Sequence, residues 1–110
     1  MILDKNGNTT IVFQENISLK KFLENLEKTY PKLKNDHIIV NLFSFTKLSA
    51  GDILEFLHIS NTHRSAKKSF VLVTNKVSYE EVPDEISVVP TVQEAKDIIM
   101  MEEIERDLDL

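Results

Sequence analysis

The sequence predicts an α/β domain built on a mixed, mainly parallel β-sheet. Two continuous apolar runs, at 37–42 and 69–74, are typical of strands that are covered on both faces. A helical apolar pattern lies between them, so a crossover would join the two strands. The chain has 110 residues, of which 42% are hydrophobic, and this suffices for one domain with one core.

The N-terminal segment, 1–13, predicts a β-hairpin. Asn6 and Gly7 would supply the two positive φ angles of a type I′ turn. Strand-forming residues at 2–3 and 9–13 flank them. This antiparallel pair at one edge would make the otherwise parallel sheet a mixed one.

A first helix is expected to begin after Ser18, whose hydroxyl can accept a hydrogen bond from the first turn. Ile17 and Phe22 have the spacing of a hydrophobic staple. Apolar residues then recur on one helical face, and Pro31 is expected to end the helix because proline disfavours helical geometry in the preceding residue. The residues of that face are Leu19, Phe22, Leu23, Leu26 and Tyr30.

A second helix would connect the two buried strands. Ser49 is its expected cap, and Asp52 stands at capping-box spacing. Its apolar face is broad, and we expect one continuous helix as far as about Ser65. A short third strand is predicted at 86–89.

The last helix is expected to start at Thr91, which forms a capping box with Glu94. Its core-facing residues are Val92, Ala95, Ile98 and Ile99. Beyond them lies an apolar stripe that points to nearly the opposite side of the helix, formed by Met101, Ile104 and Leu108. Either this stripe docks onto a partner or a second subunit, or the helix bends or frays so that Met101 and Ile104 cap the core. We therefore divide the chain into a domain at 1–100 and an acidic, amphipathic C-terminal helix extension at 101–110.

Charge is distributed unevenly along the chain, whose net charge is −5. Residues 56–76 hold four basic side chains and no acidic one, whereas 77–110 hold eleven acidic and two basic ones. Nucleic acid binding requires many phosphate contacts, which this overall field opposes. The basic segment leaves one alternative open: an accessory subunit of a nucleic-acid-processing enzyme, such as a ribonuclease without its zinc chemistry. Its basic face would consist of Arg64, Lys67, Lys68 and His63.

Catalytic motifs are missing from the sequence. The chain has no cysteine, which excludes thiol nucleophiles and thiolate metal sites. Its three histidines do not have metal-ligand spacing, and no glycine-rich phosphate loop or serine nucleophile elbow occurs. The carboxylate pairs at 80–81, 84–85 and 102–103 are expected to be solvated. We therefore expect no enzyme activity, no cofactor and no metal.

Two further patterns bear on location. No apolar run is long enough to span a membrane. The N-terminus lacks the basic and apolar regions of a secretory signal. The expectation is a cytoplasmic protein without membrane contact.

The turn from the first buried strand into the second helix, 46–53, is the first candidate docking surface. Ligands and partners of open α/β sheets meet the carboxyl ends of the strands, where this turn would lie. Gly51 has no side chain there and would let another backbone approach closely. An ordinary capped helix start is the competing interpretation. The candidate contact residues are Lys47, Leu48, Ser49, Ala50, Gly51 and Asp52.

This turn and the order of elements resemble the STAS domain, the sulphate transporter and anti-sigma factor antagonist family. Asn41, Leu42, Thr46, Leu48 and Ile53 fall on the family's central pattern, and the likeness extends over about 1–100. It implies an opening pair of strands, then alternating helices and parallel strands, and a binding function.

The resemblance has a departure at the position that the family phosphorylates. Ala50 stands in place of the phosphorylatable serine, and Ser49 replaces an aspartate. Ser49 is thus the candidate for a displaced modification site, although it is also the expected helix cap.

Together these patterns predict a non-enzymatic protein–protein interaction module that resembles anti-sigma factor antagonists. It would dock through the turn 46–53, with Met101, Ile104 and Leu108 as a second contact. The expected partner is another protein, with a homodimer through the last helix as the alternative.

Overall fold

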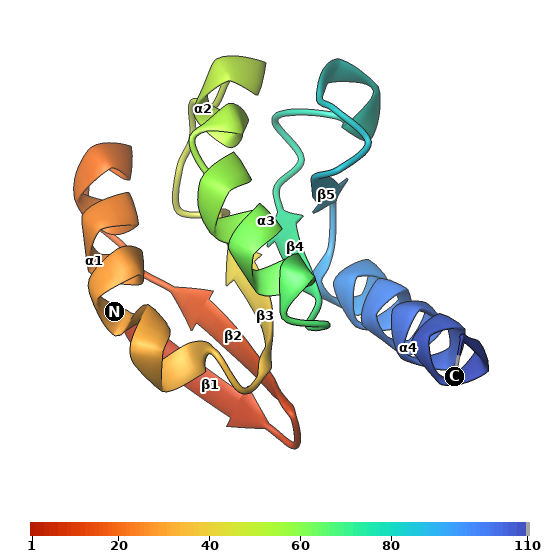
Figure 1. Cartoon of the computed structure of the whole chain (residues 1–110). Helices are drawn as coiled ribbons and strands as arrows, with labels where there is room; N and C mark the ends of the chain where they lie inside the picture. Colours follow the sequence, from red (N-terminus) through yellow and green to blue (C-terminus); the bar gives the residue numbers. More distant parts are fainter. Residues whose placement is uncertain (110) are drawn as a thin grey trace.

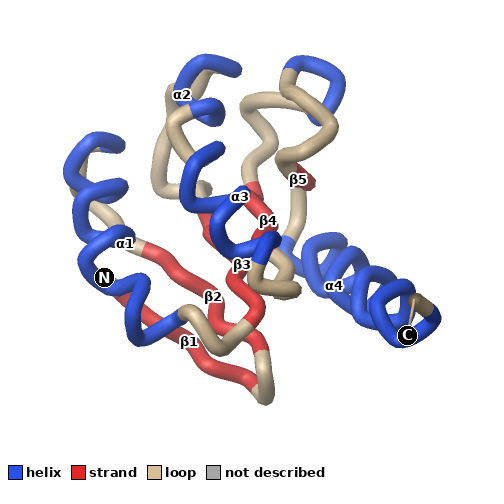
Figure 2. Tube along the Cα trace, viewed as in Figure 1, coloured by secondary structure: helices blue, strands red, loops and turns tan. Residues whose placement is uncertain are grey.

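A computed structural model describes residues 1–109 and places a five-stranded sheet between two helical layers (Figures 1 and 2). The predicted α/β class, with a mainly parallel sheet and an N-terminal hairpin, is confirmed, and the described chain contains four α-helices. The strands are β1 (Ile2–Asn6), β2 (Thr9–Phe13), β3 (His37–Asn41), β4 (Phe70–Val73) and β5 (Ser87–Val89). The helices are α1 (Leu19–Leu33), α2 (Ala50–Leu54), α3 (Leu57–Ser65), the 3₁₀ turn η1 (Tyr79–Glu81) and α4 (Val92–Leu108).

The strands follow one another across the sheet in chain order. β1 and β2 are antiparallel, and every later neighbouring pair is parallel. Because each right-handed crossover steps in the same direction, α1 and the α2–α3 segment lie on one face of the sheet. α4 follows β5, the edge strand, and covers the other face.

The hairpin forms with a different turn from the predicted one. Asn6 pairs with Thr9, so the two-residue loop is Gly7–Asn8 and not Asn6–Gly7. Gly7 has a φ of 64°, whereas neither Asn6 nor Asn8 has a positive φ. A glycine with positive φ at the first loop position fits a type II′ turn, in which only that position needs it.

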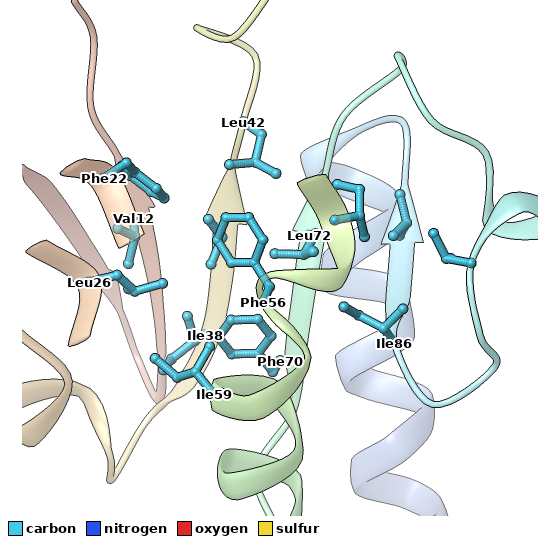
Figure 3. Close-up of a cluster of buried hydrophobic side chains, with 14 of the residues drawn as sticks. Val12, Phe22, Leu26, Ile38, Leu42, Phe56, Ile59, Phe70, Leu72 and Ile86 are labelled. Atoms are coloured by element: carbon cyan, nitrogen blue, oxygen red, sulfur yellow. The ribbon is translucent and has the colours of Figure 1, made fainter. Parts of the chain in front are cut away.

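Strands β3 and β4 are covered on both faces, as their continuous apolar runs predicted. Ile38 and Val40 of β3 face the larger core, together with Phe70 and Leu72 of β4. This core lies between the sheet and α1–α3, and Phe22, Leu26, Phe56 and Ile59 fill it from the helical side (Figure 3). A smaller core on the opposite face contains Ile39, Val71, Val73, Ala95 and Ile99.

Helix α1 does not end at Pro31, contrary to the prediction. Ser18 caps its start by accepting a hydrogen bond from the Lys21 N–H at 3.2 Å, but the helix runs through Pro31 to Leu33. Proline costs one intrahelical hydrogen bond here, close to the C-terminus of the helix. Leu33 is buried in the larger core, and its packing favours one more helical turn.

The predicted second helix consists of two helices, α2 and α3, which are separated at Glu55 and Phe56. The N–H groups of these two residues bond to Asp52 and Ile53 in the tighter three-residue pattern, which interrupts the α-helix. Both Ile53 and Phe56 are completely buried. The interruption turns both side chains into the core and accounts for the broad apolar face of this segment.

Helix α4 is continuous to Leu108, so the proposed bend or fraying at its C-terminal end is wrong. Thr91 caps it by accepting a hydrogen bond from the Glu94 N–H at 3.1 Å. The predicted capping box is incomplete, because the Glu94 carboxylate accepts from the Thr91 hydroxyl, at 2.9 Å, and not from the Thr91 N–H. No helix within residues 1–109 has the length and apolar character that crossing a bilayer requires.

Candidate functional site

The turn 46–53 lies at the carboxyl end of β3, where the sequence predicted it. Lys47, Ser49 and Gly51 are exposed, whereas Leu48 and Ala50 are half-buried and pack against the larger core. Two of the six predicted contact residues thus anchor the turn, and the three exposed ones alternate with them on the surface.

Ser49 and Asp52 form a complete capping box. The Ser49 hydroxyl accepts from the Asp52 N–H at 3.2 Å, and the Asp52 carboxylate accepts from the Ser49 N–H at 2.9 Å. These two bonds satisfy backbone donors that would otherwise be free at the start of α2. The hydroxyl proposed for modification is therefore also a structural cap.

Gly51 is not required by the local conformation. Its φ is not positive, and a Cβ atom there would meet only the Ser49 hydroxyl oxygen, at an ordinary 3.6 Å. A side chain at position 51 would project from the surface without disturbing the core. A large substitution at this residue is therefore a suitable probe of the turn as a docking surface.

An open hollow of about 490 Å³ adjoins the turn between α1 and α2. Leu19 and Leu23 supply its apolar lining. Four carboxylates and one ammonium group surround them, from Glu24, Glu27, Asp52, Glu55 and Lys20. The turn thus borders a shallow apolar depression with an acidic rim.

The apolar stripe of α4 faces solvent. Met101 is 60% exposed, Ile104 is 53% exposed and Leu108 is 78% exposed. The hypothesis that Met101 and Ile104 cap the core is therefore wrong. Met100, at 58% exposed, lies beside the stripe.

The opposite side of the same helical segment is polar and contacts the protein. Glu102 accepts from the Ser69 hydroxyl at 2.6 Å and from Arg64 Nη2 at 3.1 Å. Arg106 donates to the Ser69 hydroxyl oxygen at 3.1 Å and lies 3.8 Å from Glu102. Glu102 is mostly covered, so the expectation that the pair 102–103 is solvated is wrong for this residue. We call Glu102, Glu103 and Arg106 the polar face of α4.

Glu103 connects α4 to a buried histidine at the start of β3. His37 Nδ1 accepts from the Ser69 N–H at 2.9 Å, so the ring proton is on Nε2, which lies 3.0 Å from the Glu103 carboxylate. Asn8, in the hairpin turn, donates to the same carboxylate at 3.4 Å. The polar face therefore reaches β3, β4 and the hairpin.

His63, proposed for a basic surface, is completely buried. Its Nε2 lies 2.7 Å from the Asp36 carbonyl oxygen, and its Nδ1 lies 2.8 Å from the Tyr30 hydroxyl. Because a carbonyl only accepts, Nε2 carries the proton and Tyr30 donates to Nδ1. Arg64, next in sequence, is paired with Glu102. The basic face of the nucleic-acid hypothesis thus loses two of its four members.

Both histidines are held in the neutral form. Burial lowers the pKa of His37, and Arg106 and Lys68 lower it further, while Glu103 opposes them. Burial also lowers the pKa of His63, against the opposing effect of the Asp36 carbonyl. A second proton on His37 would have to go to Nδ1, where the Ser69 N–H already points. The two rings act as structural hydrogen-bonding groups.

The two candidate docking surfaces lie at opposite ends of the sheet. The turn 46–53 follows the carboxyl end of β3. The stripe of α4 lies over the amino ends of β3 and β4, as the contacts of its polar face to His37 and Ser69 show. The structure therefore does not bring the two predicted sets of residues together.

Sequence reasoning missed the polar face. Its signal is present, because Glu102, Glu103 and Arg106 continue the helical spacing of Ala95 and Ile99 by three, four and seven residues from Ile99. The same side of α4 thus faces the sheet along the whole helix, but its residues are apolar in the first half and polar in the second.

Comparisons with known proteins do not assign the chain to a family. No protein family matches the sequence, and no curated protein matches it. Within residues 1–109, no three histidine, aspartate or glutamate side chains are grouped so that they could hold a metal ion.

Proposed function

We propose that this protein is a non-enzymatic binding domain that docks a protein partner on the outer face of α4 and on the turn 46–53. One observation carries the proposal: the C-terminal half of α4 turns its polar residues toward the protein and its apolar stripe toward solvent. Helices on the surface of monomeric domains normally do the reverse. A stripe of this kind is typical of a surface that another chain covers.

The contacts of the polar face suit such a role. They fix α4 over the sheet with directed hydrogen bonds, so the stripe is presented on a rigid helix. A partner that covers the stripe would gain about 25 cal/mol for each Å² of apolar surface removed from water. It would also avoid most of the cost of ordering the helix, which is already formed.

The turn 46–53 would provide a second, independent contact. Its exposed residues Lys47, Ser49 and Gly51 alternate with anchored ones, and it borders the hollow between α1 and α2. The resemblance to STAS domains supports a binding role for this turn. The order of elements, an opening strand pair followed by alternating helices and parallel strands, is compatible with that resemblance.

Affinity capture with the full chain as bait tests the proposal. We expect Ile104→Asp to remove the partners that bind α4, and Gly51→Arg to remove those that bind the turn. Ile2→Asp is the matched control, because Ile2 is 60% exposed on the edge strand β1 and belongs to neither proposed surface. Partner sets that are identical for all four proteins would contradict the proposal.

Sedimentation of the same variants separates a foreign partner from a second copy. If wild type is a dimer and Ile104→Asp is a monomer, the stripe is covered by another copy of the chain. If both are monomers, a second copy is excluded, and the proposal then requires a different protein on the stripe. Circular dichroism of each variant confirms that the helix content is unchanged.

A further inference from the structure

The rim of the apolar stripe is acidic. Asp97 lies two helical turns before Ile104 and four residues before Met101, on the same side of α4. Glu105 is four residues after Met101 and three before Leu108, and Glu94 is seven residues before Met101. All three carboxylates are on exposed residues.

No basic side chain of α4 lies beside Met101, Ile104 or Leu108. Arg106 is directed inward, to Ser69 and Glu102. Lys96 is one turn before Met100, at the far margin of the stripe. The charge that α4 presents on this side is therefore negative. The polar face does not offset it, because its two glutamates outnumber Arg106.

This charge distribution selects among the classes of partner. Nucleic acids and anionic lipid surfaces carry the same sign of charge and would be repelled. A second copy of α4 would bring carboxylates against carboxylates, which is costly at an interface. A partner surface that is both apolar and cationic would cover the stripe and pair with its acidic rim.

The shape of the stripe indicates a helix. Met101, Ile104 and Leu108 form a ridge of about 10 Å along α4, the length of two helical turns. Ridges with this spacing pack into the grooves of a second helix. Methionine adapts to irregular surfaces, so Met100 and Met101 suit such a contact.

We infer that the partner of α4 is a basic amphipathic helix, with an aliphatic stripe that covers Met101, Ile104 and Leu108 and with lysine or arginine beside it to pair with Asp97 and Glu105. This inference rests on the proposed function and specifies the chemistry of one of its two surfaces.

Three synthetic peptides, stapled so that they are helical in solution, test it. They share one leucine stripe and differ only in the flanking residues, which are lysine, glutamine or glutamate. We expect the full chain to bind the lysine peptide at least about tenfold more tightly than the glutamate peptide, as measured by fluorescence anisotropy. Added salt should reduce this preference because it screens the rim charges.

Two variants of the protein locate the binding. Ile104→Ser should weaken binding of the lysine peptide at least about tenfold. The matched control Ile2→Ser should leave this affinity unchanged. Asp97→Lys combined with Glu105→Lys should reverse the preference, so that the glutamate peptide binds more tightly. Reversal on the rim variant would assign the selectivity to these two carboxylates.

The remaining outcomes overturn the inference in distinguishable ways. The glutamine or glutamate peptide could bind as tightly as the lysine peptide while Ile104→Ser still weakens binding of all three. The stripe then docks helices, but the inferred selection by charge is wrong. If none of the peptides binds, the inference is wrong, and affinity capture with Ile104→Asp shows whether the proposed docking function fails with it. If wild type dimerises through the stripe, a second copy occupies the surface.

Discussion

The two halves of α4 face the same sheet with opposite chemistry. In the N-terminal half, Ala95 and Ile99 are buried against Ile39, Val71 and Val73. In the C-terminal half, Glu102 and Arg106 occupy the corresponding positions, and the apolar side chains point to solvent. The helix is continuous across this change, so helical periodicity alone does not determine which side of a helix is apolar.

The surface beneath the helix accounts for the difference. α4 runs back across the sheet from the carboxyl end of β5, so its first half lies over the apolar middles of the strands. Its second half lies over their amino ends, where His37 and Ser69 supply polar groups. Buried polar groups need partners, and the polar face of α4 provides them.

The largest expected contrast is between two isoleucines on this helix. Ile99→Ala should lower the free energy of unfolding by about 3 kcal/mol, because it leaves a cavity in the smaller core, where Ile99 is 4% exposed. Ile104→Ala should change it by less than about 0.5 kcal/mol, because the side chain is already in water. Urea denaturation of the two variants measures the difference, and equal losses would mean that Ile104 is also buried against the protein.

The second contrast is between two glutamates. Glu102→Gln should lower the free energy of unfolding by about 2 kcal/mol, because Arg64 and Arg106 would lose the carboxylate that they share. Each of these arginines already has a buried Nη1 atom without a partner in the described chain. Glu105→Gln, the matched control on the exposed side, should be nearly neutral.

Hydrogen exchange locates the effect of the Glu102 substitution. We expect faster exchange at 101–108 in Glu102→Gln and unchanged exchange at 92–99, because only the second half of α4 depends on the polar face. Uniformly faster exchange along the helix would show that its two halves are not held independently.

The pH dependence of stability provides a third contrast. Both buried histidines have a pKa below the ordinary value of 6.5, so below pH 6.5 the unfolded chain binds protons that the folded chain does not. Stability should therefore fall as the pH decreases from 6.5, by up to about 1.4 kcal/mol per pH unit for each histidine, and should level off below the folded-state pKa values.

His37→Gln separates the histidine beneath the polar face from His63. The variant should lose its own share of this slope while the contribution of His63 remains. Chemical denaturation at several pH values measures both slopes. A slope that is unchanged in His37→Gln would mean that His37 titrates normally in the folded protein.

The periodic apolar segments were predictable from the sequence. Continuous runs at 37–42 and 69–74 indicated strands covered on both faces, and the observed bounds differ by a residue or less at each end. The caps at Ser18, Ser49 and Thr91 were also predictable, because a cap depends on local spacing.

The errors have tertiary causes. Burial of Leu33 extends α1 past Pro31, and burial of Ile53 and Phe56 divides the second helix. The polar face was missed because its partners, His37 and Ser69, are far away in the sequence, and only the sheet brings them together with α4. The position of the apolar stripe was predictable from the helix, but its exposure depended on those same contacts.

The smallest expected effect on stability comes from oxidising the exposed side of α4. Met100 and Met101 are 58% and 60% exposed, so mild peroxide should convert both to sulfoxides, which mass spectrometry detects. The polar sulfoxides would face water, so the free energy of unfolding should change by less than about 0.5 kcal/mol. Binding of the lysine-flanked helical peptide should nevertheless weaken, because the sulfoxides reduce the apolar character of the docking surface. A large loss of stability would instead show that these methionines pack against the protein, and that the outer side of α4 resembles its inner side more than the structure indicates.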